Sequence, residues 1–268
     1  MKLLKISAFG LMALAAVSCK KDDSSSSNTT TTSTTSTTAT TSTTSTTSTT
    51  SSDELAIYKK IYGTSSVTKD GDYVVIKSNG LPDHKSPYYQ NTQWQAEKYE
   101  AYNGSGTFNQ NPNSITQQNL TFRIPFHPQE ASTKQATPGG PIGVALNGIP
   151  FFNQYAAIGA PLTNEVVSFD QYGGHPQQQG QYHYHIEPYY ITAQKGKSVL
   201  LGFLLDGFPV YGPMEDNKTI TNADLDAYHG HLHATVEYPD GIYHYHITSA
   251  DPYINGNGFF GTPGTVTN

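Results

Sequence analysis

The stretch GQYHYHIEP at residues 180–188 returns as GIYHYHITS at residues 241–249, so four of the ten histidines of the chain lie in two copies of Tyr-His-Tyr-His. On a β-strand, successive side chains point to opposite faces. The tyrosines of each copy therefore share one face, which we expect to be the core face, and the two histidines share the opposite, polar face. The pattern predicts two strands that each carry a His-x-His pair.

Both copies belong to a longer internal repeat. The repeat begins with GVALNGIPFFN in the first copy and GFLLDGFPVYG in the second, continues with DQYGGH and DAYHGH, and ends with Tyr-His-Tyr-His. These features, in the same order, predict two duplicated units at about 143–186 and 202–247. Because a strand-rich unit of this size rarely buries its own face, we expect the two to pack on each other around a pseudo-twofold axis.

Other parts of the chain also carry strand and turn signals. Residues 72–77 and 120–125 alternate in hydrophobicity, and residues 198–205 form an apolar run between glycines, so all three are predicted strands. Short helices are expected at 92–101 and 222–228. The predicted fold is all-β or β-rich, with two duplicated strand-rich units packed as one domain and long loops.

The His-x-His pairs have the spacing of a metal-binding clip. Histidines at positions i and i+2 of a strand lie roughly 7 Å apart at the backbone, and their rings can converge on one ion at about 2.0–2.1 Å. Imidazole ligands suit zinc and copper. His183 with His185, and His244 with His246, are therefore predicted ligands of a transition metal, Cu or Zn. The alternative is a solvated face on which the histidines bond tyrosines or backbone.

A third histidine occupies the same place in each unit. His175 precedes the first pair and His231 precedes the second. The turn signal Pro239-Asp240-Gly241 predicts that a strand at 231–238 returns to lie beside 242–247, which would bring His231 or His233 toward the pair. Three histidines with one open position form a catalytic or exchangeable metal site, so His175 and His231 complete the predicted ligand sets.

Carboxylates near the histidines are candidates for a supporting role. Asp170 and Asp226 precede the third histidine of each unit, where each can orient a ring by accepting its second N–H or can cap a turn. Glu187 lies on the histidine side of the first predicted strand. His229 and His233 have no counterpart in the first copy and are lesser candidates for the metal.

The N-terminus has the pattern of a lipoprotein signal peptide at residues 1–18. Lys2 and Lys5 precede an apolar run that is too short to span a bilayer. Cys19 follows in a sequence that resembles a bacterial lipobox, so we expect it to be lipidated, and as the only cysteine it cannot form a disulfide within the chain. The stretch CKKDD at 19–23 resembles the start of Bacteroidetes surface lipoproteins.

Residues 19–52 are expected to form the lipidated cysteine and a disordered stalk. From residue 24 to 52 every residue is Ser or Thr except Asn28 and Ala39, and such a tract has no apolar surface to bury. The folded domain is therefore predicted at 53–268.

Charge and composition restrict the partners. The net charge is −6 and Arg123 is the only arginine, so the sequence has no basic patch for a phosphate backbone, and nucleic acid is excluded as a partner. The predicted membrane contact is the N-terminal lipid anchor, and a protein or glycan partner is left open. We expect an outer-membrane lipoprotein exposed at the cell surface.

Over most of residues 70–268 the chain resembles the YHYH domain family. That resemblance implies a secreted or surface domain, and it adds His84 as a candidate ligand, although His84 by itself is typical of an ordinary loop histidine. The segments that carry the resemblance are GLPDH at 80–84, Asn147-Gly148, Gly174-His175-Pro176, YHYH at 182–185 and DGFPVYGP at 206–213.

Three functions fit these features. The predicted one is binding of a transition metal by a surface lipoprotein, with no assigned catalytic residue. The second is a metal-dependent hydrolase or oxidoreductase, for which Glu187, Asp170 and Asp226 are the nearby carboxylates. The third is an adhesion or glycan-binding module, since nineteen tyrosines and a stalk suit that role. The sequence contains no serine nucleophile elbow, Walker loop or His-Glu-x-x-His motif.

Overall fold

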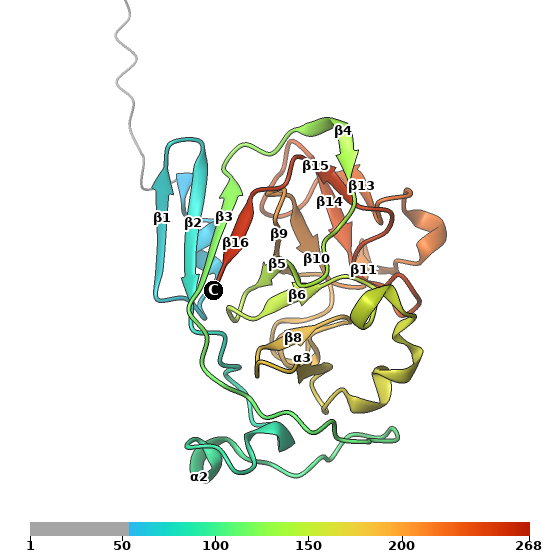
Figure 1. Ribbon diagram of the computed structural model, residues 1–268. Helices are drawn as coiled ribbons and strands as arrows, with labels where there is room; N and C mark the ends of the chain where they lie inside the picture. Colours follow the sequence, from blue (N-terminus) through green and yellow to red (C-terminus); the bar gives the residue numbers. More distant parts are fainter. Residues whose placement is uncertain (1–53) are drawn as a thin grey trace, which may run out of the picture. The chain divides into compact units, whose positions relative to one another are not determined.

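The computed structural model describes residues 54–268 as a β-rich domain (Figure 1). This part of the chain contains sixteen strands and few helices, which confirms the predicted fold class. The predicted signal peptide, Cys19 and the Ser/Thr-rich stalk lie outside the described residues. Within residues 54–268, no helix combines the length and the apolar character that a membrane span needs.

The largest sheet has eight strands and carries both Tyr-His-Tyr-His segments. In pairing order its strands are β13 (Gly230–His233), β14 (Ile242–His246), β10 (Pro209–Tyr211), β9 (Leu200–Leu204), β5 (Pro141–Ala145), β6 (Pro150–Phe152), β8 (Tyr182–Tyr184) and β7 (Gly174–Pro176). The two halves have the same arrangement. In one half, β10 is antiparallel to β9, β14 is parallel to β10, and β13 is antiparallel to β14; in the other, β6, β8 and β7 follow β5 in the same way. This is the order expected for two copies of one unit.

A local twofold axis runs between the central strands β5 and β9. Val144 and Phe203 hold the same position in the sequence repeat, and they pair directly across these antiparallel strands. A twofold rotation about this point maps the residue pair on one side of it onto the residue pair on the other side. The pseudo-twofold arrangement predicted from the repeat is therefore present in the register of the sheet.

The central hairpins turn at Asn147-Gly148 and Asp206-Gly207, and Asn-Gly and Asp-Gly are the residue pairs that favour tight hairpin turns. Gly148 has φ 79° and Gly207 has φ 86°, which is the left-handed region that glycine enters without steric cost. Each turn therefore depends on its glycine, while the preceding Asn147 or Asp206 is free to use its side chain elsewhere.

A second sheet of four strands brings the two ends of the described chain together. In pairing order it contains β1 (Ser66–Asp70), β2 (Tyr73–Ser78), β3 (Leu120–Pro125) and β16 (Thr265–Thr267). Figure 1 shows β16, in red, beside the green β3. The strands predicted at 72–77 and 120–125 correspond to β2 and β3. Ser78 Oγ donates to the Gly148 carbonyl at 2.8 Å and links this sheet to the β5–β6 turn.

Short elements occupy the connections. The paired strands are β4 (Glu130–Gln135) with β15 (Phe259–Gly261), and β11 (Met214–Glu215) with β12 (Lys218–Thr219). The helices are η1 (Tyr58–Lys60), η2 (Pro87–Tyr89), α2 (Gln95–Lys98), η3 (Ala157–Gly159), η4 (Leu162–Asn164), η5 (Val166–Ser168), α3 (Tyr189–Lys195) and η6 (Asn222–Asp224). The helices predicted at 92–101 and 222–228 are shorter than expected, since only α2 and η6 form there.

The strands that carry Tyr-His-Tyr-His are buried on both faces. Tyr182 faces the core, as predicted, and is fully buried. The histidines were expected on a polar face, with a solvated face as the alternative to metal binding; the face is not solvated, because His183 is 2 % exposed and His244 is 0 % exposed. Connections between strands cover that face, because Asn153 contacts His185 and Glu215 contacts His244. The histidines therefore lie in an interior where each polar atom needs a partner.

Candidate metal centres

Two antiparallel hairpins bring the predicted histidines together. Across β7 and β8, His175 pairs directly with His183. Across β13 and β14, His231 pairs directly with His244. Because directly paired residues project to the same side of a sheet, each third histidine stands beside its His-x-His pair. His231, and not His233, is the residue that the hairpin places opposite the pair.

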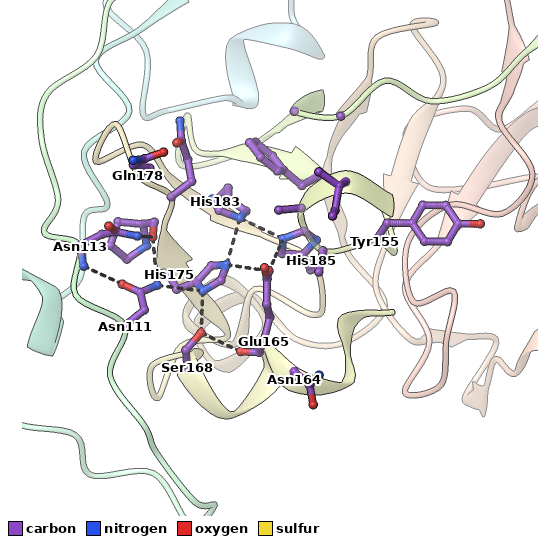
Figure 2. Close-up of a pocket in the computed structure, with 18 of the residues that line it drawn as sticks. Asn111, Asn113, Tyr155, Asn164, Glu165, Ser168, His175, Gln178, His183 and His185 are labelled. Carbon is purple, nitrogen blue, oxygen red and sulfur yellow. Dashed lines mark hydrogen bonds and ion pairs between the residues drawn. The ribbon is translucent and has the colours of Figure 1, made fainter. Parts of the chain in front are cut away.

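The first group, which we call cluster A, consists of His175, His183 and His185 (Figure 2). The Nε2 atoms of His175 and His183 are 3.1 Å apart, and those of His183 and His185 are 2.9 Å apart. Two nitrogens that each lie 2.0–2.1 Å from one ion are about 2.9 Å apart at a right angle and about 3.4 Å apart at the tetrahedral angle. The spacing in cluster A therefore fits ligands of a single ion.

The second group, cluster B, consists of His231, His244, His246 and Glu215. The Nε2 of His244 is 3.2 Å from that of His231 and 3.1 Å from that of His246. The Glu215 carboxylate lies 3.1 Å from His231, 3.2 Å from His244 and 3.7 Å from His246. Cluster B thus offers four convergent ligand atoms, three nitrogens and one oxygen.

The tautomer of the paired histidines follows from their Nδ1 partners. In cluster A, Nδ1 of His183 lies 3.1 Å from the Gln181 carbonyl and Nδ1 of His185 lies 2.6 Å from the Asn153 carbonyl. A carbonyl oxygen only accepts, so both Nδ1 atoms carry the proton. In the neutral ring, Nε2 then has a free lone pair, which is the form that binds a metal.

Cluster B repeats this arrangement. Nδ1 of His244 donates to the Ile242 carbonyl at 3.0 Å, and Nδ1 of His246 donates to the Gly212 carbonyl at 2.7 Å. These acceptors are equivalent in the repeat to those in cluster A. A backbone carbonyl on the second nitrogen is the usual means of fixing a metal-binding histidine.

The third histidine of cluster A is oriented by a serine. Nδ1 of His175 lies 2.7 Å from Ser168 Oγ, which itself donates to the Glu165 carbonyl at 2.7 Å. Because the only hydroxyl proton is used on that carbonyl, the serine oxygen accepts from His175. Asn111 Nδ2 is farther from the ring, at 3.3 Å. Nε2 of His175 is then also unprotonated and faces the other two.

Burial keeps the rings of cluster A uncharged. It lowers the pKa of His175 to about 3 and that of His185 to about 4, and it holds the pKa of His183 well below its ordinary value. At neutral pH the three lone pairs therefore meet with no proton between them, which is electrostatically unfavourable. A cation bound at the centre removes this repulsion.

The two clusters differ in what occupies the fourth side. In cluster B, Glu215 closes the site. In cluster A the nearest carboxylate oxygen, Oε2 of Glu165, remains 3.7 Å from Nε2 of His175 and 4.0 Å from Nε2 of His185. A cavity of about 900 Å³ opens in front of the three histidines. Figure 2 shows the Glu165 carboxylate directed toward His175 and His185, and Asn164 farther from them.

Comparison with known proteins agrees with this geometry of paired motifs. The family model described as YHYH protein matches residues 121–220 and 214–258. The chain belongs to the YHYH family. No curated protein and no solved structure matches the chain. The first matched segment contains cluster A and the second contains cluster B.

Of the two roles predicted for the aspartates of the YHYH repeat, the structure shows turn capping and not the orientation of a cluster histidine. Asp170 Oδ1 accepts from the Tyr172 N–H, and Asp226 Oδ1 accepts from the Tyr228 N–H. Asp170 accepts hydrogen bonds from Tyr182 Oη at 2.8 Å and from Ser86 Oγ at 2.6 Å. Asp226 accepts from Tyr243 Oη at 2.9 Å. The loop that carries each aspartate packs on the tyrosine face of the hairpin, while backbone carbonyls take the ring N–H groups. The aspartates therefore support the strands and not the rings.

Glu187 also lies away from the histidines. Thr192 Oγ1 donates to it at 2.5 Å, and Lys197 Nζ lies 3.7 Å away. Strand β8 ends at Tyr184, so the alternation that placed Glu187 on the histidine side does not extend to it. Its described partners belong to α3 and the residues after it.

The lesser candidates of the YHYH domain occupy distinct places. Nδ1 of His233 lies 3.1 Å from Glu215 Oε1 and helps to hold that carboxylate at cluster B. His229 is buried, and its Nε2 lies 3.2 Å from Asn222 Oδ1. Nε2 of His84 lies 3.2 Å from Tyr184 Oη, on the tyrosine side of β8. Of these residues, only His233 reaches a described cluster.

Sequence reasoning missed two carboxylates, Glu165 and Glu215. Both lie in the connection that follows the inner hairpin of a unit, and those connections do not resemble each other in sequence. Glu215 comes shortly after Gly212, the residue whose carbonyl holds His246. This position in the sequence was the only indication that Glu215 lies near the histidines, and it can be interpreted only when the strand order is known.

Proposed function

We propose that this domain binds two transition-metal ions, one at cluster A and one at cluster B. The observation that carries the proposal is the shared tautomer of the His-x-His pairs. Their Nδ1 protons bond carbonyls, and their bare Nε2 atoms meet the neighbouring Nε2 atoms at 2.9–3.2 Å. An interior that collects lone pairs without protons is stabilised by a cation.

Copper and zinc are the proposed ions. Imidazole suits both, and affinity for nitrogen ligands is high for copper and zinc among the divalent first-row metals. Three histidines with a carboxylate at cluster B, and three histidines with an open side at cluster A, are both donor sets of zinc and copper sites.

The proposed setting is the cell surface. The support is the sequence: the signal pattern of residues 1–18, the lipobox-like end at Cys19 and the Ser/Thr-rich stalk that follows. The lipid would attach the chain to the outer membrane, and the stalk would hold the metal-binding domain away from it. Radiolabelled palmitate incorporation that is lost in Cys19→Ala, together with protease accessibility on whole cells, tests this placement.

Metal analysis of the purified protein tests the binding proposal. Plasma mass spectrometry is expected to find two equivalents of zinc or copper in the wild type. His183→Asn/His185→Asn should retain one equivalent, and so should the matched variant His244→Asn/His246→Asn. Circular dichroism checks that both variants fold. A folded wild type that binds no zinc or copper after reconstitution would refute the proposal.

Metal-dependent catalysis is a second candidate, favoured by one observation. The open side of cluster A faces the cavity and Glu165, a carboxylate whose pKa is raised by burial. A bound ion there can hold a water molecule as a fourth ligand. Turnover that disappears on chelation and in His183→Asn/His185→Asn, but persists in His244→Asn/His246→Asn, would identify cluster A as an active site.

A further inference from the structure

The two halves of the domain have diverged most in the connection that follows the inner hairpin. In the second half, β10 ends at Tyr211 and β11 begins at Met214, so Glu215 reaches cluster B at once. In the first half, β6 ends at Phe152 and the chain makes three short helices before β7 begins at Gly174. The equivalent connections, residues 153–173 before β7 and residues 212–229 before β13, are similar in length but fold differently. The second brings a carboxylate within ligand distance of its histidines, whereas the first borders a cavity.

This difference changes what an ion can do at each site. Structural metal sites are saturated by protein ligands, whereas exchangeable sites keep one position for water or a substrate. Cluster B has four ligand atoms within 4.8 Å of one another. Cluster A has three, and Glu165 at 3.7–4.0 Å from two of them is 32 % exposed. The free position of an ion at cluster A therefore faces the cavity.

The cavity is almost uncharged and has both polar and apolar lining. Glu165 is the only charged side chain among the described residues that line it, because burial keeps the three histidines neutral, and this lining contains no lysine or arginine. Anionic ligands such as phosphates or uronates would therefore find no cation except the metal. Amides dominate the polar part of the lining, among them Asn109, Asn113, Asn164, Gln177 and Gln178.

Three of these amides are available to a ligand. Among the described residues 54–268, the side chains of Asn109, Asn164 and Gln178 make no hydrogen bond within the protein, and all three are exposed. Figure 2 shows Asn164 and Gln178 on opposite sides of cluster A. An amide offers both a donor and an acceptor, which matches the two-way hydrogen bonding of a hydroxyl group. The cavity thus presents hydroxyl-binding groups on both flanks of the metal position.

The rim of the cavity adds apolar surface. Tyr155 is 47 % exposed and Ile158 is fully exposed, although both line the same cavity. Ile158 also has φ 57°, a conformation that is unusual for a β-branched residue and that is found most often at functional sites. A cavity that combines an exposed tyrosine ring with amides free to form hydrogen bonds suits the alternating apolar and hydroxyl faces of a sugar.

We propose that the cavity binds a neutral oligosaccharide and that a sugar hydroxyl reaches the open position of the ion at cluster A, while the ion at cluster B is held by protein alone. This inference rests on the proposed function, because it needs an ion at cluster A. It adds a ligand class and assigns different roles to the two sites. A cavity of about 900 Å³ accommodates several sugar units.

The first part of the test asks which of the two ions has a coordination position that an external ligand can occupy. Copper-loaded protein is titrated with azide, and electron paramagnetic resonance follows the copper signal, after the copper content of each sample has been measured. His244→Asn/His246→Asn, which keeps only cluster A, is expected to respond to azide. His183→Asn/His185→Asn, which keeps only cluster B, is not. Equal responses of two fully loaded variants would overturn the assignment.

The second part tests the ligand class by calorimetry. Cellohexaose, mannohexaose and xylohexaose serve as neutral probes, with hexagalacturonate as the charged control and a neutral hexapeptide as the alternative. At least one neutral sugar is expected to bind, and Asn164→Ala/Gln178→Ala should weaken it at least tenfold with unchanged copper content. Preference for hexagalacturonate or the peptide, or no binding of any neutral sugar by fully loaded protein, would overturn the proposal. Absence of copper would instead refute the underlying metal site.

Discussion

His185 and His246 hold the same position in the two repeats, and their rings are fixed in the same way. His185 donates its Nδ1 proton to the carbonyl of Asn153 at 2.6 Å, and His246 donates to the carbonyl of Gly212 at 2.7 Å. The first acceptor directly follows β6, and the second directly follows β10. Each of these strands is the parallel neighbour of the strand at whose end the histidine lies. The orientation of these ligands therefore depends on strand topology, and any side chain at the acceptor position preserves it.

The carboxylate of Glu215 is expected to contribute directly to affinity at cluster B. Glu215→Gln keeps the shape of the side chain but removes the negative charge beside His231 and His244, so zinc affinity at cluster B should fall at least about tenfold. Competition with a chromophoric chelator measures this change in His183→Asn/His185→Asn, where only cluster B remains.

A matched control comes from the first repeat. Glu165→Gln, measured in His244→Asn/His246→Asn, should change zinc affinity at cluster A much less, because Glu165 lies 3.7 Å or more from the nearest ligand nitrogen. Equal losses in the two backgrounds would show that cluster A is closed by its carboxylate as cluster B is.

Asp170 is expected to matter for stability and not for metal content. It is 4 % exposed and accepts bonds from Tyr182 and Ser86. Asp170→Ala leaves these buried hydroxyls without an acceptor, at a cost of about 3 kcal/mol or more in the free energy of unfolding. Asp226→Ala should cost about 1 kcal/mol, because water can replace this exposed carboxylate. Urea denaturation compares them, and equal costs would contradict the role of burial.

The alternation of Tyr-His-Tyr-His was sufficient to predict the hairpins and most of the site. Period-two patterning places His183 on the same strand face as His185 whatever the surrounding fold is. The Pro239-Asp240-Gly241 turn predicts a hairpin that brings His231 or His233 to the second pair, and the register of the strands places His231 opposite His244. Local rules succeeded here because the ligands lie close together in sequence.

The remaining features depend on contacts that are distant in sequence. The histidine face is buried because connections from other parts of the chain cover it. The sequence of a strand does not show which segments will pack against it. Glu165 and Glu215 reach the clusters from such connections. Asp170 was assigned to a histidine because it lies near one in sequence, whereas its partner Ser86 comes from a segment before the repeat.

The hydroxyl of Tyr245 is expected to stabilise a buried charge. It donates to Asp206 at 2.6 Å and accepts from the Phe260 N–H at 2.7 Å. Burial raises the pKa of Asp206 to about 6, so the carboxylate is charged at pH 7.5. Tyr245→Phe should therefore lower the free energy of unfolding by about 2–3 kcal/mol at that pH.

The other repeat provides the control. There the hydroxyl of Tyr184 accepts a hydrogen bond from the neutral Asn147, and Tyr184→Phe should lower the free energy of unfolding by about 1 kcal/mol. Urea denaturation that ranks the two in the opposite order would contradict this account.

Acid is expected to destabilise the metal-free protein through cluster A. Burial lowers the pKa of His175 to about 3 and of His185 to about 4, below the unfolded value of about 6.5. The unfolded chain therefore binds protons first, and the free energy of unfolding should fall as the pH drops from about 6.5 toward 4, by up to about 1.4 kcal/mol per pH unit for each histidine. Burial raises the pKa of three carboxyl groups, those of Asp206 (to about 6), Asp170 and Glu165, and these act in the opposite direction. They are outnumbered by the seven histidines whose pKa burial lowers. Urea denaturation of chelator-treated protein at pH 7.0, 6.0 and 5.0 measures the slope, and saturating zinc should move the loss to lower pH. Stability that is constant over this range would show that the rings are accessible to protons in the folded state.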